Sequence, residues 1–558
     1  MRLSGLAWFQ THEDEQRALN SILRAPAGYR SVDELKSEFM EGTREELFEE
    51  LTLWSTGGFP RKEPRRIYFL TGAAGLGKSS IAHQFCARLD SPQRRSLGAS
   101  FFFVRGSGDL ESIRLFFPTL AHQLAISQPQ LQSRIISAAR DHYKRGDRQQ
   151  MRHAFEDLVR IPLLDAPIGD EGPIILVIDG LDECKDRDLI PLLLRCILEL
   201  VSALPWLQVF VTSRPEPHVL GTFASPEAAV MVYRRSLDDT LEAWEDDVKR
   251  YLRETIPKIP PYTQFIREHP EDLERLVERA GGVFVYARIA INFLDTYRDH
   301  PEEQFGLLLS SLGAGVEPLD ALYLQVLRSA FPPNYLRTSP PHRERLHAFL
   351  TSLILLNGSH SPDVVASFCH GVDKDDVISM VDRLRSVLLV STGGEVRPIH
   401  ATLGEFLLDE ARCTDPLYHV DRPKAEAQLA SACFAAFSVK IMTDCLAVDP
   451  TQTLTSATWQ HVHYASAYWV VHLQAAGFSE ELLLQLHAFN IEKMPVYRRS
   501  VLEEDKESFG AITRGFKSWL MVSNLCPSFP MRWQVNGSYV FAYCKDFRKR
   551  TGGTRDKP

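Results

Sequence analysis

The sequence predicts an α/β domain with a doubly wound parallel sheet, followed by mainly helical regions. The first observation is a glycine-rich segment, residues 72–79, between an apolar strand pattern at 67–71 and a helix pattern that follows it. The second is a set of continuous apolar runs that alternate with helical stretches, as strands buried on both faces of a parallel sheet do. These runs lie at 97–104, 173–180 and 207–212. The third is that beyond about residue 230 the patterns are mainly helical, without further continuous apolar strand runs.

The first regular element expected is a helix from Arg44 to about Trp54. Apolar residues recur on one face of this stretch. Thr43 and Glu46 have the spacing of a capping box, in which each side chain satisfies a backbone N–H group at the helix start. We therefore expect the helix to begin directly after Thr43.

The glycine-rich segment has the pattern Gly-x-x-x-x-Gly-Lys-Ser. Its glycines let backbone N–H groups converge on a phosphate, its lysine adds a positive charge, and its serine offers a hydroxyl to Mg²⁺. A chance glycine-rich turn is the alternative, but the required strand and helix flank the motif. The pattern predicts a site for a nucleoside triphosphate, with ATP or ADP and Mg²⁺ as cofactors. The expected nucleotide-binding residues in it are Gly72, Gly75, Gly77, Lys78, Ser79 and Ser80.

Acidic residues follow the apolar run at 173–178. Asp179 stands where a phosphate loop needs a metal-holding acid, so Ser79 and Asp179 are the expected magnesium ligands. Asp182 or Glu183 could act as the general base that polarises an attacking water. The alternative is that these carboxylates only cap the next helix.

Arg214 follows the next strand pattern, at 207–212. Ligands of open α/β sheets bind at the carboxyl ends of the strands, and a guanidinium suits phosphate recognition. We expect Arg214 to sense the γ-phosphate and count it with the catalytic residues. The alternative is a loop arginine that faces water.

The chain after residue 230 reads as helices and one hairpin. Three short helical patterns, at 343–356, 361–369 and 373–385, precede strand patterns at 386–390 and 395–400 that a Gly-Gly turn connects. Three helices closed by a hairpin predict a winged-helix domain. His400 ends the second strand, and taken alone it would be an ordinary core or surface histidine.

Composition excludes several classes of protein. The formal charge is −9, from 63 basic and 72 acidic side chains, and provides no general attraction to nucleic acid or to an acidic membrane. Charged residues and prolines interrupt the longest apolar run, 189–211, so we expect a buried helix and strand there and no membrane span. Nine scattered cysteines without a Cys-x-x-Cys pair indicate reduced thiols and a cytoplasmic protein.

These patterns divide the chain into six expected parts. They are an N-terminal lead-in at 1–40, the P-loop NTPase domain at 41–230, a helical domain at 231–317, a winged-helix domain at 318–415, a C-terminal α-helical region at 416–545 and a basic tail at 546–558.

Together the glycine-rich loop, the strand ending in Asp179, the Thr-Ser-Arg-Pro segment around Arg214 and the winged-helix pattern resemble a NACHT-type NTPase. More narrowly, the chain is similar to fungal NOD-like receptor proteins of the STAND class. The NACHT module of those proteins is often labelled nephrocystin-3-like at its N-terminal part. The resemblance covers about residues 41–413.

The resemblance implies a role for each matching segment. Residues 42–45 resemble the pre-Walker segment that lies against the base and ribose, which makes Arg44 a nucleotide contact. Residues 72–79 are similar to the Walker A loop. Asp179, with Asp182 and Glu183, matches the extended Walker B acids.

Three further segments match the family, one of them with a departure. Arg214 matches the sensor 1 arginine. Residues 396–402 look like the winged-helix segment whose histidine, here His400, touches the ADP β-phosphate in the closed state. At 281–287 related proteins have a Gly-x-Pro motif, and here Phe284 or a neighbour stands in place of the proline.

The function expected from these features is a nucleotide-dependent molecular switch. ADP would hold the winged-helix and helical domains on the sheet domain, and ATP would release them to form a homo-oligomer, with slow ATP hydrolysis as a reset. Such receptors usually carry effector and repeat domains, which we do not identify here, so protein partners are expected to supply sensing and signalling. No nucleic acid or membrane partner is expected.

Three alternatives remain at this stage. One is a P-loop kinase that transfers phosphate to a second substrate. Another is a DNA-binding winged helix, although the acidic pattern at 373–385 is a poor match to phosphates. The last is a degenerate scaffold that binds nucleotide and does little else.

Overall fold

The computed structural model describes most of the chain, with gaps. The described residues are 15, 17–32, 40, 42–59, 65–145, 150–164, 166, 172–310, 317–391, 393–436, 457–476, 481, 482 and 485. The basic tail expected at 546–558, most of the lead-in at 1–40 and most of the C-terminal region beyond 436 lie outside these residues.

The chain divides into two compact units. The first consists of residues 1–326 with 400–402, and the second of residues 327–399 and 403–558. The expected NTPase and helical domains therefore lie in the first unit, and most of the expected winged-helix domain lies in the second.

A five-stranded parallel sheet is the centre of the first unit. Its strands stand in the order β2-β3-β4-β1-β5. Every neighbouring pair is parallel. The strands are β1 (Ile67–Thr71), β2 (Leu97–Phe102), β3 (Ile174–Asp179), β4 (Leu207–Ser213) and β5 (Val232–Ser236). β4 lies between β1 and β3, so the glycine-rich loop and Asp179 end two strands that share one neighbour.

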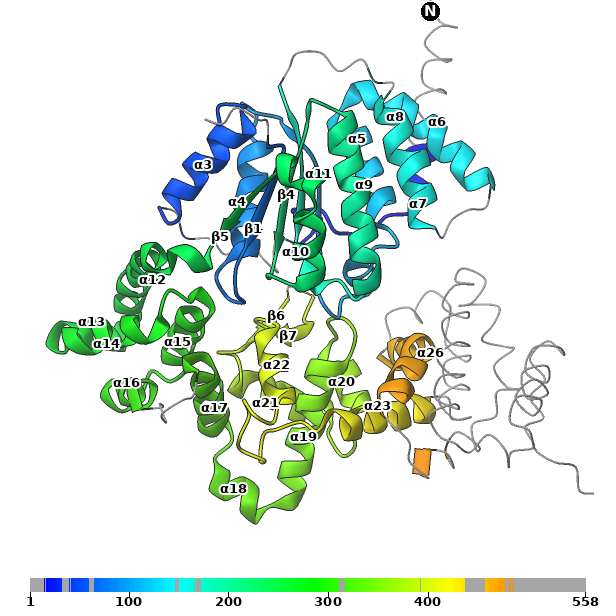
Figure 1. Cartoon of the computed structure of the whole chain (residues 1–558). Coiled ribbons are helices and arrows are strands. Elements are labelled where there is room, and N and C mark those ends of the chain that lie inside the picture. The colour runs from blue at the N-terminus through cyan, green and yellow to red at the C-terminus, as the bar shows by residue number, and fades with distance from the viewer. Residues whose placement is uncertain are drawn as a thin grey trace, which may run out of the picture. The chain divides into compact units, whose positions relative to one another are not determined.

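Helices cover both faces of this sheet, which confirms the doubly wound fold (Figure 1). The connection from β1 to β2 runs in the opposite direction to the connections from β2 to β3 and from β3 to β4. Because such crossovers are right-handed, α4 lies on one face while α5 and α9 lie on the other. The helices of this part are α3 (Glu45–Ser55), α4 (Lys78–Leu89), α5 (Phe116–Ser127), α6 (Pro129–Arg145), α7 (Met151–Ala154), α8 (Ile161–Leu164), α9 (Ile190–Ala203), α10 (Pro217–Phe223) and α11 (Pro226–Met231).

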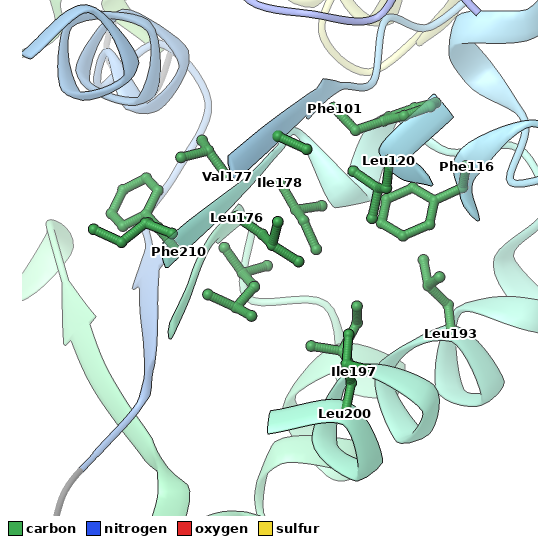
Figure 2. Close-up of a cluster of buried hydrophobic side chains, with 14 of the residues drawn as sticks. Phe101, Phe116, Leu120, Leu176, Val177, Ile178, Leu193, Ile197, Leu200 and Phe210 are labelled. Atoms are coloured by element: carbon green, nitrogen blue, oxygen red, sulfur yellow. The ribbon is translucent and has the colours of Figure 1, made fainter. Parts of the chain in front are cut away.

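The core explains why the apolar runs form strands. All residues of β1, β3 and β4 are buried. Figure 2 shows Leu176 and Ile178 of β3 between side chains of α9, such as Ile197, and aromatic rings near α5. Phe101 and Phe116 lie there with their ring centroids 5.0 Å apart. The aliphatic strand thus has an apolar layer to pack against, which is what a continuous run requires.

One π-helical segment, Phe155–Arg160, connects α7 to α8. The sheet also has a fifth strand, β5, just beyond residue 230, where the domain was expected to end. Its Tyr-Arg-Arg sequence is polar and only partly buried, as suits an edge strand.

The rest of the first unit is a helical segment. It consists of α12 (Leu241–Thr255), α13 (Pro260–Glu268), α14 (Pro270–Ala280), α15 (Phe284–Thr296), α16 (Pro301–Ser310) and the first part of α17 (Pro318–Ala330). Its α12 and α15 contact the sheet domain, as described below.

The second unit holds the three short helices and the hairpin that the sequence predicts. They are followed by helices up to residue 475. The elements are α18 (Pro333–Thr338), α19 (Pro340–Leu355), α20 (Pro362–Phe368), α21 (Lys374–Arg383), the antiparallel pair β6 (Leu388–Val390) and β7 (Val396–Pro398), α22 (Thr402–Leu408), α23 (Arg422–Ala436) and α26 (Ala457–Ala475). Among the helices described, none has both the length and the apolar character needed to cross a membrane.

Candidate functional site

The glycine-rich loop joins β1 to α4. Gly75 and Gly77 have φ angles of +82° and +84°, in the left-handed region that favours glycine. A Cβ atom at Gly75 would lie 2.5 Å from Cγ1 of Val285, which α15 contributes. The loop therefore needs glycine there for its backbone conformation and for its close approach to the helical segment.

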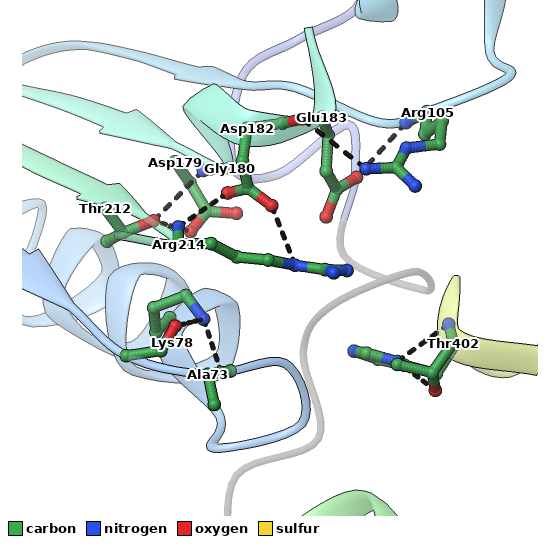
Figure 3. A network of polar contacts seen from close by, with 12 residues as sticks. Ala73, Lys78, Arg105, Asp179, Gly180, Asp182, Glu183, Thr212, Arg214 and Thr402 are labelled. Carbon is green, nitrogen blue, oxygen red and sulfur yellow. Dashed lines mark hydrogen bonds and ion pairs between the residues drawn. The ribbon is translucent and has the colours of Figure 1, made fainter. Parts of the chain in front are cut away.

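Lys78 begins α4 and turns its side chain back into the loop. Its ammonium group donates hydrogen bonds to the carbonyl oxygens of Gly72, at 2.7 Å, and Ala73, at 2.8 Å (Figure 3). The side chain is buried. Burial lowers the pKa of Lys78, while the charges of Asp182, Asp179 and Glu183 oppose that shift. The ammonium group is thus held by the backbone of the loop and lies within the electrostatic influence of the three acids.

Asp179 ends β3 and is fully buried. The hydroxyl of Thr212, in the neighbouring strand β4, donates a 2.6 Å hydrogen bond to its Oδ1 atom. The same hydroxyl accepts a 3.0 Å hydrogen bond from the backbone N–H of Gly180. Thr212 thereby fixes the carboxylate and the peptide that follows it (Figure 3).

Asp182 and Arg214 form a close pair. The Nε atom of Arg214 lies 3.1 Å from Oδ2 of Asp182. The backbone N–H of Arg214 donates to Oδ1 at 3.0 Å. Both carboxylate oxygens of Asp182 therefore contact the arginine that the sequence places at the sheet edge. A paired, hydrogen-bonded carboxylate is suited to orient Arg214 toward a phosphate.

Glu183 is held by a loop that follows β2. The backbone N–H of Arg105 donates a 3.1 Å hydrogen bond to its Oε2 atom. The loop is itself anchored by Glu111, whose carboxylate accepts hydrogen bonds from Gly106 N–H at 2.8 Å and from Lys185 Nζ at 2.9 Å. Glu183 thus has a defined orientation, which a general base requires.

The prediction of a capping box at the start of α3 is wrong. The N-cap residue is Arg44, whose left-handed backbone has φ 57°, and no side chain caps the helix. The hydroxyl of Thr43 donates instead to the carbonyl of Met40 at 2.7 Å. Arg44 is buried, and its Nη2 atom donates to the carbonyl of Leu76, inside the glycine-rich loop, at 2.8 Å. The side chain reaches the loop, and its expected contact with a nucleotide stays a prediction.

His400 lies with Thr402 at the end of the hairpin. Its Nδ1 atom lies 2.8 Å from the hydroxyl of Thr402, which is also 2.7 Å from the hydroxyl of Tyr323. Residues 400–402 group with the first unit. The expected contact between His400 and a β-phosphate stays a prediction.

Sequence reasoning missed several residues that position this site. Thr212 and Arg105 orient the acids. Asp247 of α12 accepts a 3.0 Å hydrogen bond at its Oδ2 atom from the backbone N–H of Arg44. Thr212 could have been found, because it is the last residue of the strand pattern at 207–212 that precedes Arg214. Asp247 lies 203 residues from Arg44, and no local pattern connects them.

The residues present fit a nucleotide with Mg²⁺. The loop has the left-handed glycines and the buried lysine that cradle phosphates, and the hydroxyl of Ser79 and the carboxylate of Asp179 supply oxygen ligands of the type that Mg²⁺ prefers. In the described part of the chain no group of three or more His, Cys, Asp or Glu side chains could hold a metal ion.

Residues 42–214 match the family model described as Nephrocystin 3, N-terminal. No curated protein compared with the chain matches it. Among the solved structures that match the chain are three that share 14% sequence identity with it. The first is a STAND protein with a tetratricopeptide repeat sensor from Pyrococcus horikoshii, with a TM-score of 0.36 over 88% of this chain and 66% of that one.

The second and third of these structures match a smaller share of this chain. A Walker-type ATPase of Pyrococcus abyssi has a TM-score of 0.26 over 65% of this chain and 94% of that one. The Drosophila ORC, solved bound to DNA, has a TM-score of 0.25 over 66% of this chain and 94% of that one.

The family match covers the segment in which the glycine-rich loop, the buried acid Asp179, the Asp182–Arg214 pair and the parallel sheet come together. Residues 42–214 are therefore similar to the Nephrocystin 3 N-terminal family, and they lie in an α/β domain with the sheet and the loop of a P-loop NTPase.

Proposed function

We propose that this protein is a nucleotide-dependent switch that binds ATP or ADP with Mg²⁺ at the glycine-rich loop. The observation that carries the proposal is the buried ammonium group of Lys78, which loop carbonyls hold and whose pKa the charges of Asp182, Asp179 and Glu183 act to raise. Nucleotide phosphates would replace those carbonyls as partners of Lys78. Ser79 and Asp179 would hold Mg²⁺, which neutralises charge on the phosphates.

Slow hydrolysis would reset the switch. Glu183, oriented by the loop after β2, is the better placed general base, because both oxygens of Asp182 contact Arg214. Arg214 would then report on the γ-phosphate, and Asp182 would keep it directed toward the sheet edge. With Glu183 as general base and Arg214 in contact with the γ-phosphate, the proposed reaction is hydrolysis, in which water accepts the phosphate.

The switch itself would involve the regions after the sheet domain. ADP would favour a closed state in which His400 contacts the diphosphate, and ATP would favour an open state that forms a homo-oligomer. A nucleotide shifts such an equilibrium only by its differential contacts with the two states, and His400 would supply one. We propose that the switch acts in cytoplasmic signalling of the NOD-like-receptor type. A winged-helix domain would take part in the change of state, and protein partners would supply the sensing and signalling functions.

Equilibrium binding of ATP and ADP to matched lysine variants tests the site. Lys78→Ala should abolish binding, whereas Lys249→Ala, which removes an equally charged side chain from α12, should leave it unchanged. Undiminished nucleotide affinity of Lys78→Ala would refute the proposed site. Phosphate release from ATP without any added acceptor would support the reset, and release that requires an acceptor would support a kinase.

A further inference from the structure

The contacts of Arg44 extend beyond the sheet domain into the helical segment. Its backbone N–H donates a 3.0 Å hydrogen bond to Oδ2 of Asp247, and its Nε atom lies 3.8 Å from the same oxygen. Its guanidinium carbon lies 5.2 Å from the ring centroid of Phe284, the first residue of α15. Together with the hydrogen bond to the carbonyl of Leu76, these contacts make Arg44 a connection between the glycine-rich loop and both α12 and α15.

The backbone of Arg44 indicates that these contacts impose its conformation. Non-glycine residues adopt a left-handed φ only where the surroundings compensate for the strain, and such outliers cluster at functional sites. Among described residues, only Arg95 and His300 share this feature with Arg44. Only 2% of the side-chain surface of Arg44 is exposed. A buried, strained arginine in contact with three elements is unlike a solvated surface charge.

The pair is partly removed from water. Burial lowers the pKa of Arg44 to about 10, and the charge of Asp247 opposes that shift. Burial also raises the pKa of Asp247, while the N–H group and the charge of Arg44 oppose the rise. Removing one partner of such a pair leaves the other buried and uncompensated, so the pair matters more than a surface ion pair.

Two further contacts hold the helical segment against the same region. The backbone N–H of Val285 points to the carbonyl of Gly75 at 3.4 Å. Arg250, one turn after Asp247 on α12, donates to the carbonyl of Gly42 at 2.8 Å. The helical segment thus contacts the glycine-rich loop at Gly75 and the residues before α3 at Gly42. Arg44, which directly precedes α3, itself contacts the same loop at Leu76.

We propose that Asp247 is a positioning residue of the nucleotide site, which acts through Arg44 to hold the carbonyl of Leu76 and so slows the release of bound nucleotide. Leu76 directly precedes Gly77 and Lys78, so the orientation of its peptide affects where the following N–H groups point. A loop fixed in its binding conformation holds a ligand more tightly because less ordering occurs on binding. This inference rests on the proposed nucleotide binding.

The test compares acid variants on the helical segment. Asp247→Ala removes the charge and the acceptor, Asp247→Asn keeps an acceptor without the charge, and Glu274→Ala removes an acid whose ion pair with Arg253 lies within the helical segment. The readouts are the dissociation rate of a fluorescent ADP analogue and the amide hydrogen exchange of peptides covering residues 72–79.

We expect the ADP analogue to dissociate from Asp247→Ala at least tenfold faster than from wild type, with Asp247→Asn between them and Glu274→Ala equal to wild type. In an Arg44→Ala background, Asp247→Ala should add little, because both variants break the same connection. Equal dissociation rates for Asp247→Ala and Glu274→Ala would overturn the inference.

Hydrogen exchange separates this inference from the proposed function. A wild-type protein that retains no ADP analogue would refute the proposed function, and the role of Asp247 is then decided by exchange without nucleotide. Faster exchange of 72–79 in Asp247→Ala than in Glu274→Ala supports the role, and equal exchange overturns it.

Discussion

Replacing Thr212 by valine tests whether the buried acid needs its strand neighbour. The two side chains have nearly the same shape, so the change removes the hydroxyl that donates to Asp179 at 2.6 Å and accepts from Gly180 at 3.0 Å. A hydrogen bond to a charged group contributes about 1.5–3 kcal/mol. Expressed entirely in Mg²⁺ affinity, this loss corresponds to roughly 10- to 100-fold weaker binding of the metal with nucleotide.

The assay is a Mg²⁺ titration of nucleotide binding and of phosphate release, with Thr212→Ser as the control. Serine keeps the hydroxyl, so Thr212→Ser should titrate close to wild type while Thr212→Val requires much more Mg²⁺. Nucleotide affinity in excess EDTA should be similar for the three proteins. The reasoning fails if Thr212→Val has a wild-type Mg²⁺ dependence while Asp179→Ala loses it.

Three further substitutions address the loop, the core and pH. Gly75→Ala should lower nucleotide affinity and the melting temperature more than Gly57→Ala, because both positions have positive φ but only Gly75 faces a nearby atom, Val285 Cγ1 at 2.5 Å; equal effects in calorimetry and binding would contradict this. Leu176→Ala should destabilise the first unit by about 2–5 kcal/mol in denaturant titrations, since this fully buried side chain leaves a cavity. Burial lowers the pKa of His122 to about 4 from 6.5, so the unfolded state takes up a proton first as the pH falls. Wild type should therefore lose up to about 2 kcal/mol more stability between pH 7 and pH 5 than His122→Gln, and equal losses in urea titrations would refute this.

The sequence was a good guide to the strands because their apolar character is continuous. β1, β3 and β4 are entirely buried, so most of their positions select apolar residues, and the pattern is visible without the structure. β5 was missed for the opposite reason. It is an edge strand with two arginines, and only its pairing with β1 defines it.

The candidate site was predictable where it follows the chain and not where it depends on the fold. Lys78 and Asp179 follow directly from a motif and a strand end. The predicted capping of α3 was wrong because tertiary contacts of Arg44 override the local sequence pattern. The contact between Arg44 and Asp247 depends on how α12 folds back on the sheet domain, and local periodicity holds no information on that.

The central claim is that bound nucleotide determines the state of the protein. The most direct test first identifies the nucleotide that co-purifies with the protein. It then measures the mass of the protein particle in solution, first with ADP and then with ATP and Mg²⁺. We predict bound ADP in a monomer that becomes an oligomer when ATP replaces ADP, and no nucleotide with Lys78→Ala. An empty site in the wild-type protein, or one mass with both nucleotides, would contradict the account.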